Sequence, residues 1–125
     1  MRIGSISENQ KVEKRIAITP EIVKKYTSLG FEVCLCTNYG SHLGIKDDYY
    51  EEVGAKISKD QSEVLNSSDI IVQLGMLSDD KCSDIKENTT IIGALNPYQN
   101  NEKLQNLVKK KINLFSLELL PRITR

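Results

Sequence analysis

The sequence predicts an α/β domain with an open, mainly parallel, doubly wound sheet and helices on both of its faces. Strand-like apolar runs alternate almost regularly with helical segments along the 125 residues. That alternation favours right-handed βαβ units, which build parallel sheets. The run at residues 69–74 is apolar almost throughout, which is typical of a strand covered on both faces. Ligands of such sheets bind at the carboxyl ends of the strands, so a site is expected there.

Each predicted strand is a short apolar run bounded by charged residues, glycine, asparagine or proline. The strands are expected, in chain order, at residues 2–6, 31–36, 55–57, 69–74, 91–95 and 112–120. The third run is short, which favours an edge position. Pro121 ends the last one because proline has no N–H to donate.

Capping signals mark the helices between these strands. Thr19 is a good N-cap, Pro20 suits the first helical position, and Gly30 is placed to end the helix. Asp60 and Glu63 have the spacing of a capping box, in which each side chain bonds the other residue's backbone N–H. The helices are expected at residues 20–29, from 47 or 48 to 53, 60–67, within 78–87 and 101–111.

The composition fits one globular domain, with 39% hydrophobic and 27% charged residues. Lys plus Arg and Asp plus Glu each count 17, and the resulting zero net charge argues against a general binder of nucleic acid or membrane surfaces. No apolar run approaches the ~20 residues of a membrane span. The N-terminus turns polar too quickly for a signal peptide. We therefore expect a cytoplasmic protein without a nucleic-acid partner and without direct membrane insertion.

Sequence spacing assigns neither a metal site nor a catalytic residue. Cys34, Cys36 and Cys82 are an odd set for a disulfide framework, and His42 is the only histidine of the sequence, so partly buried thiols are expected. No G-x-G-x-x-G follows the first strand, where Gly4 stands alone. A complete dinucleotide site is therefore not predicted.

Two polar residues stand out beside the apolar runs. Arg15 precedes residues 16–18 and should lie near the ligand-facing edge, where a guanidinium clamps a carboxylate or phosphate with two bonds. The commoner alternative is a solvated surface arginine. Gln73 lies inside the most apolar strand. Its amide either contacts a ligand at the strand end or is satisfied by neighbouring backbone, since a buried amide needs partners in both cases.

Two further groups follow the later strands. Asn96 opens a polar loop directly after a buried strand, which suits a ligand contact, although turn chemistry alone explains Asn and Pro there. Arg122 and Arg125 follow the last strand and either bind an anionic cofactor or are simply exposed. Because no terminal helix or polar tail follows, we expect the chain to be cut within a motif.

A set of stretches becomes recognisable when their order and spacing are taken together. They are residues 2–4 (Arg-Ile-Gly), 13–20 (Glu-Lys-Arg-Ile-Ala-Ile-Thr-Pro), 29–33 (Leu-Gly-Phe-Glu-Val), 39–49, 54–57 (Gly-Ala-Lys-Ile), 68–71 (Ser-Asp-Ile-Ile), 95–100 (Leu-Asn-Pro-Tyr-Gln-Asn) and 118–125 (Glu-Leu-Leu-Pro-Arg-Ile-Thr-Arg). This set resembles the N-terminal domain shared by alanine dehydrogenase and the alpha subunit of proton-translocating NAD(P) transhydrogenase. The resemblance covers essentially the whole chain.

Two positions separate the branches of that family. Alanine dehydrogenases typically have Leu-His where this chain has Leu95-Asn96, and that histidine serves their active site. They also place a lysine, which helps bind the substrate carboxylate, at the position of Gln73. The segments Asn-Pro-x-Gln-Asn and Pro-Arg-Ile-x-Arg resemble the transhydrogenase branch. That branch usually keeps the lysine too, so Gln73 departs from both.

The resemblance implies a flavodoxin- or Rossmann-like fold and a share in hydride transfer between NAD(H) and NADP(H), coupled to proton movement across a membrane. In the family, NAD(H) lies between two α/β domains, and the dinucleotide fingerprint belongs to the second, which this chain lacks. The first contributes an arginine that matches Arg122 near the nicotinamide. The implied partners are the remaining alpha-subunit domain and the beta or membrane subunits, and a homodimer is also considered.

We therefore expect residues 1–125 to form the N-terminal domain of a transhydrogenase alpha subunit, inactive alone, with NAD(H) bound mainly by the missing domain. Arg122 is the expected cofactor contact, and Arg15, Gln73 and Asn96 form the expected substrate or anion pocket. One alternative is the substrate domain of an alanine dehydrogenase-like amino-acid oxidoreductase. Another is a stand-alone α/β module that binds a small ligand.

Overall fold

In the computed structural model, six strands form one sheet in the order β3-β2-β1-β4-β5-β6, and every neighbouring pair is parallel. The structure describes residues 1–8, 15–75, 77, 79–94 and 100–117. The strands are β1 (Arg2–Ser5), β2 (Glu32–Cys36), β3 (Lys56–Ser58), β4 (Ile70–Gln73), β5 (Thr90–Gly93) and β6 (Asn113–Ser116). The predicted parallel sheet is confirmed, with β3 at an edge as expected.

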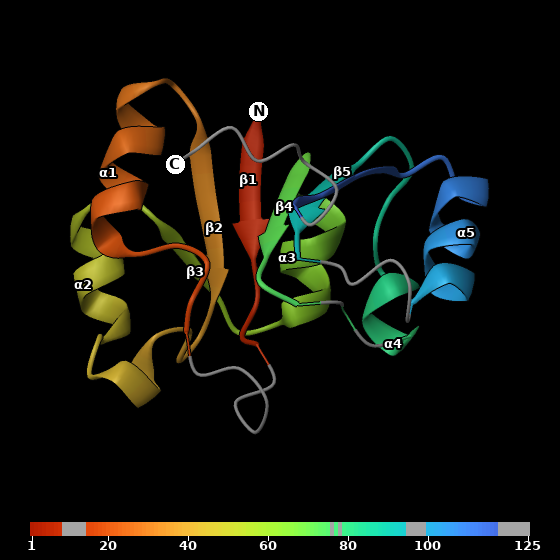
Figure 1. Ribbon diagram of the computed structural model, residues 1–125. Coiled ribbons are helices and arrows are strands. Elements are labelled where there is room, and N and C mark those ends of the chain that lie inside the picture. Colours follow the sequence, from red (N-terminus) through yellow and green to blue (C-terminus); the bar gives the residue numbers. More distant parts are fainter. Residues whose placement is uncertain (9–14, 76, 78, 95–99, 118–125) are drawn as a thin grey trace, which may run out of the picture.

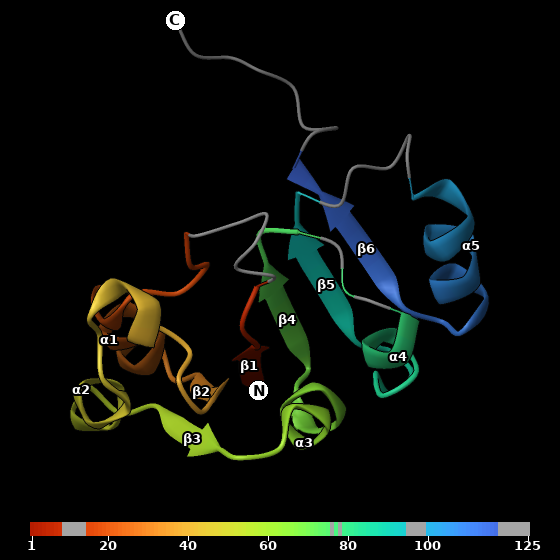
Figure 2. The same ribbon diagram turned by 90° about the horizontal axis from the view of Figure 1, so that it is seen from below.

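Helices lie on both faces of this sheet (Figures 1 and 2). They are α1 (Pro20–Ser28), α2 (Asp47–Glu52), α3 (Gln61–Ser67), α4 (Asp79–Cys82) and α5 (Asn101–Lys109), with a short 3-10 turn η1 (Ser41–Leu43). In Figure 2, α1 and α2 lie on one side of the sheet, and α3, α4 and α5 lie on the other. The chain thus winds outward from β1 toward β3 and then from β4 toward β6, which is the doubly wound arrangement.

The winding changes direction between β1 and β4. These strands are neighbours in the sheet, with Ile3 opposite Ile70 and Gly4 opposite Ile71. Ligands of doubly wound sheets bind at such a switch point, at the carboxyl ends of the strands. The close approach of α3 to β1 also depends on Gly4, because a methyl group there would collide with Ser68 Oγ.

The capping signals behave largely as predicted. Thr19 Oγ1 accepts a hydrogen bond from Ile22 N at 3.4 Å, and Gly30 follows the end of α1 with a φ of 93°. Asp60 caps α3 by accepting from Ser62 N at 2.9 Å. The other predicted bond of the capping box, from Asp60 N to the Glu63 carboxylate, is wrong. Ser58 at the end of β3 accepts from Asp60 N and also binds the Glu63 carboxylate, so Glu63 does not reach back to Asp60.

The core lies between the sheet and its two helical layers, but the cover is uneven. In β4, Ile71 and Gln73 are buried, whereas Ile70 and Val72 on the opposite face are only partly buried. The sequence predicts that β4 is covered on both faces, but the described residues fully cover only one of them. Among those residues, no helix is long and apolar enough to cross a membrane.

Candidate functional site

The side chain of Gln73 lies at the switch point, where β4 ends beside β1. The residue is 2% exposed. Its Oε1 accepts hydrogen bonds from Ile6 N at 2.7 Å and Ser5 Oγ at 2.9 Å. Its Nε2 donates to Ile6 O at 3.1 Å and to Glu8 Oε2 at 2.9 Å. An amide side chain accepts two bonds and donates two, so these four contacts use its full capacity.

Glu8 completes the polar cluster from the segment that follows β1. Its Oε2 accepts from Leu74 N at 2.8 Å and its Oε1 accepts from Gly75 N at 3.1 Å, in addition to the bond from Gln73. Successive backbone N–H groups of this kind form a small anion-binding nest, and here a carboxylate of the same chain occupies it. Glu8 therefore ties the segment after β1 to the segment after β4.

Ser5 and Tyr39 extend the cluster into the core. Ser5 Oγ lies 2.8 Å from Tyr39 Oη and points its one hydrogen toward Val72 O at 2.6 Å and Gln73 Oε1 at 2.9 Å. Because those two atoms can only accept, the phenol must donate to Ser5. Tyr39 Oη in turn accepts from Ile18 N at 3.2 Å. Burial raises the pKa of Tyr39 to about 12, which keeps the phenol in its donating form.

A second buried tyrosine, Tyr50, also binds the backbone of Ile18. Tyr50 Oη donates to Ile18 O at 2.8 Å, and its ring meets that of Tyr39 edge to face at a centroid separation of 5.8 Å. Burial also raises the pKa of Tyr50. Both backbone groups of Ile18 are thus bound by buried phenols, which places the start of α1 relative to the end of β1.

The cysteines are free thiols, as predicted. Cys34 and Cys36 are both buried, and burial raises the pKa of Cys34. Cys36 Sγ, at the end of β2, lies 3.2 Å from both the backbone nitrogen and the hydroxyl of Ser7. Within the described ranges, no three His, Cys, Asp or Glu residues gather as a metal site.

The structure describes two of the four predicted site residues, Gln73 and Arg15, and they lie in different surroundings. Gln73 takes the arrangement expected of an amide satisfied within the chain, and a direct ligand contact would have to replace one of its four bonds. Arg15 is exposed on the bend that leads toward α1. Asn96 and Arg122 lie outside the described residues.

Three members of the cluster are missing from the sequence-based set, namely Ser5, Glu8 and Tyr39. Sequence signals point to two of them, Ser5 and Tyr39. Ser5 is a polar residue at the end of an apolar strand, as Gln73 is, and the ends of adjacent parallel strands meet. Tyr39 follows the end of β2 at the same edge of the sheet. Comparing polar residues at all strand ends would have found both.

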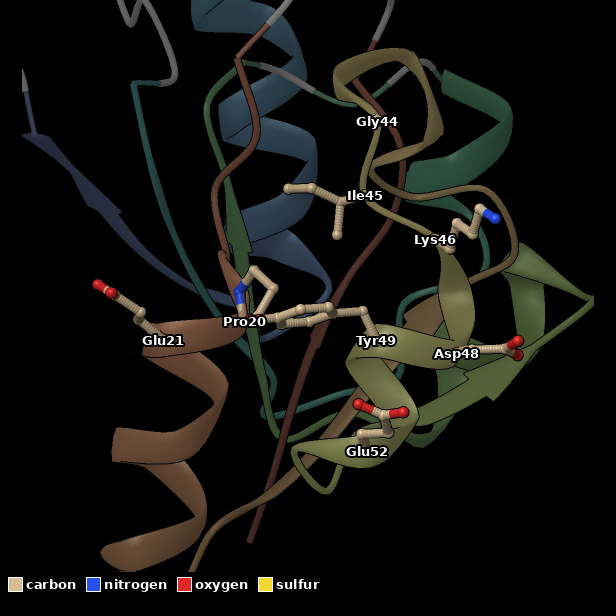
Figure 3. Close-up of a pocket in the computed structure, with 8 residues that line it drawn as sticks. All are labelled: Pro20, Glu21, Gly44, Ile45, Lys46, Asp48, Tyr49 and Glu52. Atoms are coloured by element: carbon tan, nitrogen blue, oxygen red, sulfur yellow. The ribbon is translucent and has the colours of Figure 1, made fainter.

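A separate cavity of about 540 Å³ lies between the start of α1 and the η1–α2 segment (Figure 3). The Tyr49 ring points toward Pro20 across it. The lining residues are Pro20, Glu21, Gly44, Ile45, Lys46, Asp48, Tyr49 and Glu52. None of them belongs to the switch-point cluster, so the volume of this cavity says nothing about the predicted site.

Comparison with known proteins agrees with the fold and with the resemblance in the sequence. Residues 4–125 match the family described as "Alanine dehydrogenase/PNT, N-terminal domain". This chain belongs to that family. An NAD(P) transhydrogenase alpha-subunit chain of Rickettsia prowazekii is 35% identical over 129 residues, which cover 100% of this chain and 34% of the relative.

Solved structures of the family show the same arrangement. The transhydrogenase from Sinorhizobium meliloti superposes with a TM-score of 0.92 at 30% identity, over 100% of this chain and 37% of that one. An L-alanine dehydrogenase superposes with a TM-score of 0.85 at 19% identity, over 93% of this chain and 32% of that one, and shows a shared fold. The chain thus spans about one third of the length of the relatives it matches.

The Gln73 network predicts a stability cost for losing its amide. Gln73→Leu leaves the Ile6 backbone groups and Glu8 short of partners, and should lower the free energy of unfolding by about 1–3 kcal/mol in urea titrations. Gln61→Leu is the matched control, because Gln61 is partly buried and its amide lies 3.8 Å from Cys36 Sγ. It should change the free energy by less than about 0.5 kcal/mol. Equal costs for the two variants would contradict the role given to Gln73.

The raised pKa of Tyr39 predicts a loss of stability at high pH. Between the ordinary tyrosine value of 10 and about 12, the unfolded chain releases this proton while the folded chain keeps it. The stability that the protonated Tyr39 gives the folded chain is therefore complete below pH 10 and is lost as the pH rises toward 12. The free energy of unfolding should fall by about 2–3 kcal/mol over this range. Unfolding titrations across this range should show a shallower decline for Tyr39→Phe, although that variant starts less stable. Parallel declines in the two proteins would refute this.

Proposed function

We propose that residues 1–125 form the N-terminal domain on the NAD(H) side of a transhydrogenase alpha subunit. The complete protein would transfer a hydride between NAD(H) and NADP(H), coupled to proton translocation, and this domain would form one wall of the cofactor cleft. The observation that carries the proposal is the full-chain match to transhydrogenase alpha subunits, at 35% identity in sequence and a TM-score of 0.92 in structure. The likeness to L-alanine dehydrogenase is weaker in both respects.

The described residues do not fit the pyrophosphate of a dinucleotide. Phosphates in such folds need a glycine-rich turn after the first strand, with bare backbone N–H groups at a helix N-terminus. Here β1 ends at Ser5 and is followed by Ile6 and Ser7, and Gly4 within the strand instead makes room for α3. The backbone nest after β4 already holds the Glu8 carboxylate, whose charge opposes a second anion. This supports the proposal that NAD(H) is bound mainly by another domain.

Within the proposed cleft, the described residues act as a rigid wall. The cluster of Ser5, Glu8, Tyr39 and Gln73 holds the edge at which ligands of this fold bind. Arg122 is proposed to contact the cofactor near the nicotinamide. Arg15, Gln73 and Asn96 are proposed to line the adjoining pocket. No proton or hydride step is assigned to any of them.

The proposed partners are the second domain of the alpha subunit and the beta or membrane subunits of a transhydrogenase. The family relatives support this, because the chain spans about one third of their length. The domain would lie on the cytoplasmic side and associate with the membrane through those subunits. A homodimer is part of the same proposal.

The alternative function is that of an amino-acid oxidoreductase, and the shared fold with L-alanine dehydrogenase favours it. An amino or oxo acid needs a positive charge for its carboxylate. Gln73 carries none, and its amide is already filled by the chain. Arg15 would then have to supply the whole anion contact.

One assay separates the two functions. The complete protein, reconstituted with its companion subunits in vesicles, is given NADH with an NADP⁺ analogue in one arm and NAD⁺ with L-alanine in the other. Hydride transfer in the first arm alone supports the proposal. Reduction of NAD⁺ by L-alanine, without transfer between the nucleotides, establishes the alternative.

The missing phosphate cradle predicts that the 125-residue chain binds NADH with a Kd of about 1 mM or weaker in calorimetry. The complete protein should bind it far more tightly. Micromolar binding by the chain alone would contradict the assignment of NAD(H) to another domain.

Arg122→Ala in the complete protein should slow hydride transfer at least about tenfold, because a charged contact that places the cofactor is lost. Stopped-flow or steady-state assays with NADH give the rate. Lys24→Ala is the control, because Lys24 is exposed on α1 and should leave the rate unchanged. A normal rate for Arg122→Ala removes Arg122 from the site.

A further inference from the structure

The cavity between the start of α1 and the η1–α2 segment has apolar walls that come from both sides (Figure 3). The Tyr49 ring points toward Pro20 across it, and Ile45 faces the same space. Tyr49 is 53% exposed, so a large part of its side chain is open to solvent. The volume of about 540 Å³ lies within the range of small-ligand sites, roughly 300–1,000 Å³. We call this space the Tyr49 cavity.

Buried contacts hold the walls of the cavity in place. Tyr50 of α2 donates to Ile18 O at 2.8 Å, directly before the Thr19 cap of α1. Ile45 N donates to Gly40 O at 3.1 Å, which fixes the segment between η1 and α2. The cavity is therefore preformed, and a ligand does not have to order its walls on binding.

The charge of the lining residues is unbalanced toward carboxylates. Glu21, Asp48 and Glu52 line the cavity, and Lys46 is the one cation among the lining residues that the structure describes. In Figure 3 the Lys46 side chain points away from Pro20. Among the described residues, none of the three carboxylates forms an ion pair or a side-chain hydrogen bond. The cavity therefore suits a cation with an apolar part.

Glu52 lies where a cation is most favourable. It is the last residue of α2 and follows Tyr49 by three residues, so the two side chains are neighbours on the helix surface. The C-terminal end of a helix carries partial negative charge and favours Lys or Arg, but α2 has no basic residue in its last turn. Glu21, by contrast, complements the positive end of α1. The negative end of α2 thus lies beside an aromatic ring that is open to solvent.

The chemistry of the walls distinguishes between kinds of cation. A bare divalent metal ion needs several oxygen ligands around one point, and no three His, Cys, Asp or Glu residues gather in this way in the part of the chain that the structure describes. A guanidinium group is planar, stacks on an aromatic face and binds a carboxylate through two parallel hydrogen bonds. An apolar stem attached to it can lie against Pro20 and Ile45.

We propose that the Tyr49 cavity binds a small organic cation that carries a guanidinium group on an apolar stem. The guanidinium stacks on the Tyr49 ring and pairs with the Glu52 carboxylate, and the stem contacts Pro20 and Ile45. A free small molecule is favoured over a protein partner, because the eight lining residues are fewer than the roughly 20–30 that a protein interface takes from each side. The cavity shares no residue with the proposed cofactor edge, so this inference goes beyond the proposed function and fails or stands independently of it.

Ligand-observed NMR on the complete native protein tests the proposal. The probe is n-butylguanidinium, and its matched control is n-butylurea, which has nearly the same shape and no charge. The guanidinium probe should saturate a site with a Kd of about 1–10 mM, and the urea should bind at least about tenfold more weakly.

Two neighbouring glutamates of α2 provide matched variants. Glu52→Gln should weaken binding of the guanidinium probe at least about fivefold, because the paired carboxylate is lost. Glu51→Gln removes the same charge from the same helix at a residue that does not line the cavity, and should change the Kd by less than about twofold at physiological salt. Tyr49→Phe keeps the ring and should bind as the native protein does, whereas Tyr49→Ala should bind at least about fivefold more weakly.

Three results would overturn the proposal. Equal binding of n-butylguanidinium and n-butylurea would show that the cavity recognises no charge. Equal weakening by Glu51→Gln and Glu52→Gln would show attraction to the acidic surface in general. Binding of the tripeptide amide Ala-Arg-Ala at least about tenfold more tightly than the butyl probe, lost in Tyr49→Ala, would assign the cavity to a protein partner.

Discussion

The buried amide of Gln73 is the constraint around which this domain is organised. An amide that leaves water must find partners for both its oxygen and its nitrogen, and Gln73 finds them in Ser5, Ile6 and Glu8. All three lie at the end of β1 or just after it, so the amide fixes how β1 and β4 lie at the point where the winding reverses. Tyr39 extends the same network to Ile18 and so to the start of α1.

The fold could be predicted from the sequence because its signals are local. Apolar runs, the Thr19 cap and the Gly30 stop each act within a few residues and were confirmed. The site could be predicted only in part, since its geometry depends on which strands are neighbours. Gln73 stands out as a polar residue in an apolar run, but its partner Glu8 lies 65 residues away and becomes visible only when β4 is placed beside β1. The reciprocal bond of the capping box is absent for a local reason, because Ser58 accepts from Asp60 N and donates to the Glu63 carboxylate, the two groups that this bond would join.

The described residues at the carboxyl ends of the strands form no phosphate cradle. The backbone nest after β4, which in other proteins receives an anion, is filled by a carboxylate of the same chain. The uncharged Gln73 beside it offers no cation to a carboxylic acid. Both features agree with the proposal that the cofactor is held mainly by another domain, and the relatives are about three times as long as this chain.

The anchoring of Ile18 by two phenols limits how far Arg15 can move. Ile18 is held at both its N–H and its C=O, and Arg15 precedes it by only three residues. A fully extended chain gains at most about 3.6 Å per residue, so the backbone of Arg15 cannot travel farther than roughly 11 Å from this fixed point. The range of its guanidinium is therefore limited to this distance plus the length of the side chain. An anion bound by Arg15 therefore lies within the reach of a segment that is anchored to the core at Ile18.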